Sequence, residues 1–142
     1  MTAKNFRGGI KAQALVEVAL MLPLVLLLVL GGIDFGRMYI TKIVLTNAAR
    51  EGANYLAYYP EDMKNDFTNT HARITHEVEN SGLVDTGNII IDEPVNCCTR
   101  GDYVEVTVRV NDMELMFGNF YEQWFTNDGE LDISGTVRMV VQ

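Results

Sequence analysis

The first pattern along the chain is a hydrophobic block without a polar face. No charged residue occurs from Val18 to Ile33, and Leu24 to Leu30 contains only Leu and Val. Extended back to Ala14, the block has 20 residues and one interruption, Glu17. A helix of about 20 apolar residues crosses a bilayer core of roughly 30 Å, whereas a helix on the core of a soluble protein keeps a polar side. The pattern predicts a membrane-spanning helix over residues 13–33.

Helical periodicity continues beyond this block. Residues 34–57 contain no Pro, and apolar or small residues recur there about every 3.6 positions until Pro60 ends the pattern. We expect one helix from about Ala14 to Ala57, whose second half, within residues 34–59, belongs to the part outside the membrane. A secretory signal peptide is the competing interpretation, but its apolar core is shorter and its helical pattern does not continue.

Residues 60–142 show the patterns of a small mixed domain. A second, amphipathic helix is predicted between Glu61 and Asn80 by apolar residues and one His at spacings of four, three and four. These residues are Phe67, His71, Ile74 and Val78. The period then changes to two, which predicts strands over residues 88–93, 103–110 and 131–141.

Together these elements predict an α+β fold. A long N-terminal transmembrane helix carries a small head of one further helix and an antiparallel sheet of three or more strands, in the shape of a lollipop. Because so small a sheet is not stable alone, the second half of the long helix is expected to lie across it.

Charge divides the chain in the same way. The 19 acidic and 11 basic residues give a net charge of −8, which disfavours a nucleic-acid partner because such proteins present a basic surface. Lys4, Arg7 and Lys11 all lie within residues 1–12, and no acidic residue precedes Glu17. The positive-inside rule keeps this basic leader in the cytoplasm. We expect a single-pass membrane protein with an acidic head outside the cytoplasm.

Glu17 follows a small residue, Ala12, at a spacing of five positions in the sequence. A small residue, four further residues and a Glu resemble the processing site of prepilins. Cleavage after Ala12 would make Gln13 the first residue and Glu17 the fifth. Glu17 could then pair with the α-amine of a neighbouring subunit and fix the axial register, because an unpaired charge in low dielectric is costly. The alternative is that Glu17 lies at the membrane interface, where its charge costs little.

Three blocks of sequence, in order, resemble the TadE-like pilin family. They are QALVEVALMLPL at residues 13–24, GIDFGRMY at 32–39 and LTNAAREGA at 45–53. The resemblance implies a minor pilin or pseudopilin of the tight-adherence (Flp-type) pilus. It further implies processing by a prepilin peptidase and assembly with other copies or related pilins by a platform in the bacterial inner membrane, towards an extracellular pilus. Ala12 stands where the family usually has Gly, and an unprocessed chain would remain a simple membrane anchor.

Small residues recur every four positions along the expected long helix. Gly32 with Gly36 forms a GxxxG pair, and Ala48 with Gly52 repeats the spacing. Small residues let helices approach closely where lipid offers no hydrophobic drive. We expect these positions to pack helices together in a bundle or filament.

Cys97 and Cys98 are adjacent, and the chain has no other cysteine. A bridge between neighbours is strained, since their Cα atoms are only about 3.8 Å apart. A vicinal disulfide, free or capped thiols, and bridges between subunits all remain open. The aromatic-rich segment from Asn111 to Asn127 is either a flap over the core or an exposed contact surface.

No pattern of catalytic or metal-binding residues emerges. His76-Glu77 begins a zinc-protease-like string, but Asn80 occupies the place of the second His. Asp128-Gly129 is better explained as a hairpin turn than as a calcium loop. We expect no enzyme, no metal ion and no cofactor.

Overall fold

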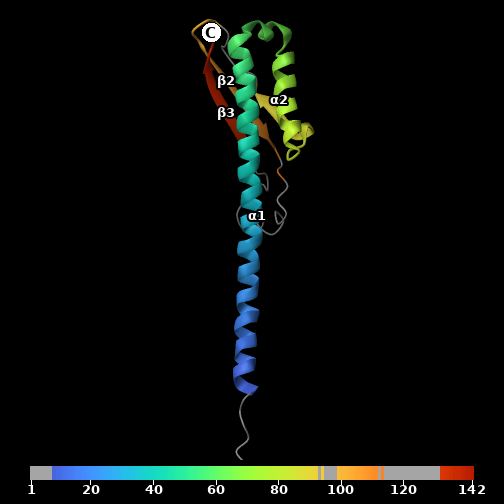
Figure 1. Ribbon diagram of the computed structural model, residues 1–142, viewed down its shortest axis with the longest axis vertical. Helices are drawn as coiled ribbons and strands as arrows, with labels where there is room; N and C mark the ends of the chain where they lie inside the picture. The colour runs from blue at the N-terminus through green and yellow to red at the C-terminus, as the bar shows by residue number, and fades with distance from the viewer. Residues whose placement is uncertain (1–7, 93, 95–98, 112, 114–131) are drawn as a thin grey trace, which may run out of the picture.

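The computed structural model describes residues 8–92, 94, 99–111, 113 and 132–142, and its long helix projects far beyond a compact head (Figure 1). The order of elements is α1 (Gly8–Tyr58), the 3₁₀ helix η1 (Pro60–Asn65), α2 (Thr68–Ser81), the 3₁₀ helix η2 (Thr86–Asn88), β1 (Ile89–Asp92), β2 (Tyr103–Val110) and β3 (Ile133–Val140). The expected α+β fold, with one long helix, one further α-helix and an antiparallel sheet, is confirmed.

Helix α1 is longer than the periodicity predicted. It begins at Gly8 instead of near Ala14 and runs without a break through Pro23 to Tyr58. At about 1.5 Å per residue its length is roughly 75 Å. The chain leaves the helix immediately before Pro60, the residue expected to end it.

The sheet has the order β1-β2-β3, and both pairs are antiparallel. Val110 lies opposite Ile89 on one side and opposite Ile133 on the other, which fixes the register. The strict alternation predicted for residues 103–110 is confirmed: one face of β2 is buried and the other is more exposed. The buried side chains are Val104, Val106, Val108 and Val110.

The second half of α1 lies against β2, β3 and α2, as the periodicity predicted (Figure 1). Its head-facing side chains are Leu45, Ala48, Ala49, Ala53 and Leu56, and all are fully buried. One contact is especially close, because a Cβ added to Gly135 of β3 would lie 2.4 Å from the backbone nitrogen of Thr46. Only glycine lets the two backbones approach to this distance.

The prediction of the second helix is wrong over the first half of its range. Instead of one helix over residues 61–80, η1 and α2 are separated by Asp66 and Phe67, which both have positive φ angles of 58° and 52°. This break reverses the chain after α1 and brings the Phe67 side chain into the core. The predicted stripe is otherwise confirmed, because Ile74 and Val78 are buried beside Phe67.

Candidate functional site

The first half of α1 is left uncovered by the other residues that the structure describes. Every residue from Ala12 to Val29 is exposed, including Leu15 at 71% and Leu20 at 74%. Within the described residues, this is the one helix long and apolar enough to span a membrane. Contact with the head begins further along, where Asp34 and Thr41 are buried. Leucines exposed to this extent are stable only among lipid or protein neighbours, since burying each contributes about 1.5–3 kcal/mol.

Ala12, Gln13 and Glu17 all lie on this uncovered helix. Gln13 and Glu17 are four residues apart and therefore on the same face. In the described part of the chain the ion pairs are Arg73–Glu51 and Arg109–Asp92, so Glu17 takes part in neither.

The small residues divide into two groups with different surroundings. A Cβ added at Gly32 or Gly36 would meet nothing within 4 Å, so this surface is open. A Cβ on Gly52 would lie 2.6 Å from Cδ1 of Ile74, and Ala48 is fully buried. Ala48 and Gly52 therefore pack α1 against the head of the same chain. The expectation that these two residues lie between subunits is corrected, because their surface is already covered.

A residue that sequence analysis missed holds the start of α2. The N-cap residue Phe67 makes no side-chain cap. Instead the Asp62 carboxylate accepts hydrogen bonds from the Thr70 backbone N–H at 2.9 Å, the Thr70 hydroxyl at 2.7 Å and the Asn69 amide at 2.7 Å. Its side chain thus fills the role of an N-cap from outside the helix.

The environment of Asp62 keeps its carboxylate charged. Asp62 is only 2% exposed. Burial acts to raise its pKa, but the hydrogen bonds from Thr70 and Asn69 outweigh burial, and the pKa of Asp62 lies below the ordinary Asp value. The distance in sequence between Asp62 and Thr70 explains why no capping pattern pointed to this contact.

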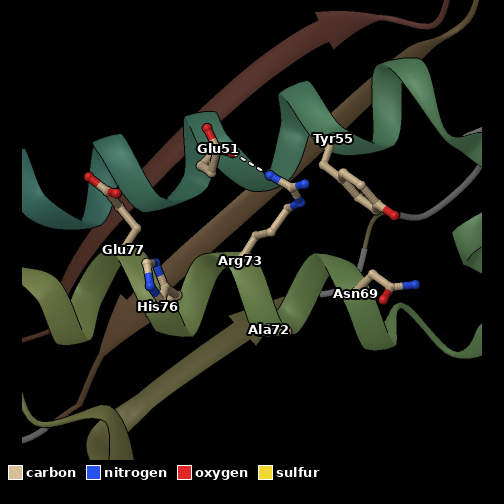
Figure 2. A pocket seen from close by; sticks show the side chains of 7 residues that line it. All are labelled: Glu51, Tyr55, Asn69, Ala72, Arg73, His76 and Glu77. Carbon is tan, nitrogen blue, oxygen red and sulfur yellow. Dashed lines mark hydrogen bonds and ion pairs between the residues drawn. The ribbon is translucent and has the colours of Figure 1, made fainter.

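A shallow cleft of about 370 Å³ lies between α1 and α2. Figure 2 shows Arg73 extending from α2 towards Glu51 and Tyr55 of α1. Arg73 forms an ion pair with Glu51 at 3.0 Å, and its guanidinium lies 4.5 Å from the centre of the Tyr55 ring. These contacts fasten one helix to the other. His76, at the edge of the cleft, is hydrogen-bonded to Asn80 at 3.0 Å.

Some predicted sites fall outside the described residues. Cys97 and Cys98 lie there, as does the aromatic-rich segment except for Asn111 and Met113. Among the residues that the structure does describe, no group of three His, Cys, Asp or Glu side chains is placed to hold a metal ion.

Comparison with known proteins points to the same helix. A family model described as TadE-like protein matches residues 12–54. No curated protein and no solved structure matches the chain. The matched range lies within α1 and contains all three sequence blocks that carried the resemblance. The resemblance is thereby confirmed over residues 12–54, the part of the chain that is similar to TadE-like proteins.

Proposed function

We propose that the chain is a pilin-like structural subunit, a minor pilin or pseudopilin of a tight-adherence type pilus. It is held in the bacterial inner membrane and assembled through its N-terminal hydrophobic helix. The observation that carries this proposal is the uncovered apolar half of α1, which extends beyond a folded head. Such a helix can be stored in lipid and then exchange its lipid neighbours for other helices.

Processing and register form the second part of the proposal. A prepilin peptidase cleaves between Ala12 and Gln13, and the new α-amine of one subunit pairs with Glu17 of the next. The match to the TadE-like family begins at Ala12, which is consistent with this junction. The pair fixes register because a carboxylate without a cation is strongly penalised among apolar helices.

The same proposal sets the topology and partners. Residues 1–12 face the cytoplasm, and the head lies outside it until the subunit joins a pilus. The partners are other copies or related pilins, the peptidase and the inner-membrane assembly platform. The role is structural, without catalysis.

Mass spectrometry of the protein purified from its own membrane tests the processing step. A chain that starts at Gln13 supports the pilin role, whereas an intact Met1 supports the alternative, a permanently anchored envelope protein whose acidic head binds a partner. The distribution of charge favours this alternative, because the chain has a net charge of −8 although its leader is basic.

Substitution of Glu17 tests the register step. Glu17→Ala is expected to remain inserted in the membrane but to abolish pilus assembly, because the α-amine of its neighbour loses its counter-ion. Glu61→Ala, at an exposed carboxylate of the head, is the matched control and should assemble normally. Normal assembly of Glu17→Ala would refute the register role.

A further inference from the structure

The cleft between α1 and α2 is lined by two rows of side chains that face one another. In each row the members are four residues apart, so each row lies along one side of its helix. The rows are Glu51, Tyr55 and Tyr59 at the end of α1, and Asn69, Arg73 and Glu77 on α2. Figure 2 shows Arg73 and Glu77 extending from α2 towards α1. The two helices pack closely beside the cleft, because Gly52 leaves room for Ile74, so its walls are held in place by the core.

Tyrosine rings form the apolar part of this cleft. The ring centres of Tyr55 and Tyr59 are 4.9 Å apart, and the two ring planes are inclined by 31°. Tyr58 and Tyr59 remain 59% and 50% exposed, and both line a hollow of about 140 Å³ that adjoins the main cleft. Aromatic rings offer a broad apolar surface and have little conformational entropy to lose, so they are well suited to bind the apolar face of a ligand.

Side chains with unused hydrogen-bonding groups surround these rings. Arg73 has five N–H donors, and among the described residues its hydrogen bond is a single one, to Oε1 of Glu51 at 3.0 Å. The amide nitrogen of Asn80 lies 3.0 Å from Nδ1 of His76. Because an amide nitrogen can only donate, Nδ1 accepts, and the neutral imidazole carries its proton on Nε2. The cleft therefore presents donors from Arg73 and His76 and an acceptor from Glu77.

The charge of the cleft disfavours an anionic ligand. Among the described residues that line it, Glu51 and Glu77 are acidic and Arg73 is basic. Arg73 is already paired with Glu51, so Glu77 leaves a negative charge in excess. A phosphate, sulfate or carboxylate group in the cleft would be repelled by this charge. The chemistry of the cleft instead fits a ligand with hydroxyl groups, an apolar face and no negative charge.

We propose that this cleft binds a neutral sugar residue of a glycan. A pyranose ring has a face of C–H groups, which stacks on an aromatic ring, and a rim of hydroxyl groups, each of which donates and accepts hydrogen bonds. Tyr59 provides the aromatic ring, and Arg73 and Glu77 provide the donor and the acceptor. The volume of about 370 Å³ is near the lower end of the roughly 300–1,000 Å³ typical of small-ligand sites, which matches one sugar residue with the rest of the glycan in solvent.

The position of the cleft makes it accessible to such a ligand. Its residues on α1 belong to the last turns of the helix, far from the uncovered apolar segment (Figure 1). A glycan can therefore reach the cleft without approaching the membrane. The proposal goes beyond the pilin-like role and does not depend on it, because the cleft is formed entirely within the head of one chain.

Saturation-transfer NMR tests binding directly. The full-length chain in phosphocholine micelles, whose headgroups contain no sugar, is titrated with the methyl glycosides of glucose, galactose, mannose and N-acetylglucosamine, and with N-acetylneuraminic acid as the anionic sugar. After subtraction of the signal from empty micelles, at least one neutral glycoside is expected to bind with a Kd on the order of 1 mM. Absence of binding by all four neutral glycosides up to about 10 mM, or tighter binding of N-acetylneuraminic acid, would overturn the proposal.

Substitution of Tyr59 locates the binding site. Tyr59→Ala removes the stacking ring and is expected to weaken binding of the neutral glycoside by about tenfold or more. Tyr59→Phe keeps the ring and should retain binding, so a loss confined to the Ala variant identifies stacking. Tyr103→Ala is the control, since Tyr103 is a 56% exposed tyrosine of β2 outside the cleft. Thermal unfolding of each variant confirms that the head is folded, and unchanged binding by folded Tyr59→Ala would refute the site.

Reversal of one charge tests why anionic sugars are excluded. Glu77→Lys replaces the excess negative charge of the cleft by a positive one, and N-acetylneuraminic acid should then bind. Glu79→Lys makes the same change in the charge of the whole chain at an exposed position of α2 that does not line the cleft. The acid is expected to bind to Glu77→Lys about tenfold more tightly than to Glu79→Lys. Equal binding of the acid to both variants would overturn the assignment of the cleft to neutral sugars.

Discussion

Asp62 and Thr70 are joined by two hydrogen bonds, one from the Thr70 backbone N–H and one from its hydroxyl, at 2.9 and 2.7 Å. This pair connects η1 to the first turn of α2 across the left-handed residues Asp66 and Phe67. The fold of the head therefore depends on a carboxylate that lies outside the helix it caps.

Removal of this carboxylate should destabilise the head. Asp62→Ala leaves the Thr70 N–H and hydroxyl without their acceptor, and we expect a loss of about 2 kcal/mol. Urea unfolding of the full-length chain in detergent micelles, followed by circular dichroism, measures the loss. Glu61→Ala, at the exposed neighbouring position, should change stability by less than about 0.5 kcal/mol. Equal effects of the two substitutions would contradict the capping role.

The lowered pKa of Asp62 predicts a specific dependence on pH. Its value in the folded chain is below the ordinary value of 3.8, so the unfolded chain binds a proton first as the pH falls. The stabilisation is therefore complete above about pH 5 and is lost as the pH falls through the folded pKa. Unfolding of the wild-type chain and Asp62→Ala, compared between about pH 5 and pH 2, should show their stability difference shrinking with acid. A constant difference would mean that the carboxylate charge is not involved.

The close approach of β3 to α1 makes Gly135 intolerant of a side chain. A Cβ there would lie 2.4 Å from the Thr46 nitrogen and 2.5 Å from the Leu45 carbonyl carbon, both backbone atoms that cannot rotate away. We expect Gly135→Ala to cost 3 kcal/mol or more, at the upper end of the about 1–3 kcal/mol typical of overpacking. Gly87→Ala is the control, since its nearest contacts are ordinary at 3.7 Å. Thermal unfolding compares them, and similar midpoints would show that α1 can move away from β3.

Gly52 faces the side chain of Ile74 instead of backbone atoms. A second substitution at Ile74 should therefore relieve part of the destabilisation caused by a side chain at position 52. The added Cβ of Gly52→Ala would lie 2.6 Å from Cδ1 of Ile74, and we expect a loss of about 1–3 kcal/mol. Ile74→Val removes Cδ1, so it should cost less in the Gly52→Ala background than the about 0.5–1.5 kcal/mol expected alone. A double-mutant cycle by urea unfolding measures this coupling. Additive losses would show that the two residues are not in contact.

The contact between Glu51 and Arg73 should contribute little through charge alone. Both side chains are about half exposed, and exposed ion pairs contribute about 0–1 kcal/mol. Arg73→Ala should cost more than Glu51→Gln, because it also removes the guanidinium from the Tyr55 ring. Urea unfolding at low and high salt tests this, with the Glu51→Gln effect expected to vanish at high salt.

The periodicity of apolar positions in the sequence was sufficient to predict most of the fold. The alternation from Tyr103 to Val110 describes one strand from end to end. The apolar block and the periodicity after it describe α1 up to Tyr58, because Pro60 marks its end. Where a side-chain period and a breaker residue coincide, local sequence and tertiary packing favour the same element.

Features that depend on a distant partner could not be predicted. The break at Asp66 and Phe67 is supported by a buried carboxylate and a core side chain, and neither leaves a local pattern. The spacing of Ala48 and Gly52 was recognised as helix packing, but such spacing does not say whether the partner helix belongs to the same chain. The contact of Gly135 with Thr46 joins positions far apart in sequence.

The unbroken course of α1 from Gly8 to Tyr58 couples two movements of the head. A rigid helix transmits rotation as well as translation, and each residue contributes about 1.5 Å and 100°. Shifting the uncovered segment by one residue along its neighbours would raise the head only slightly but would turn it by more than a quarter of a circle. The axial position of the head and its orientation about the helix axis are therefore set together.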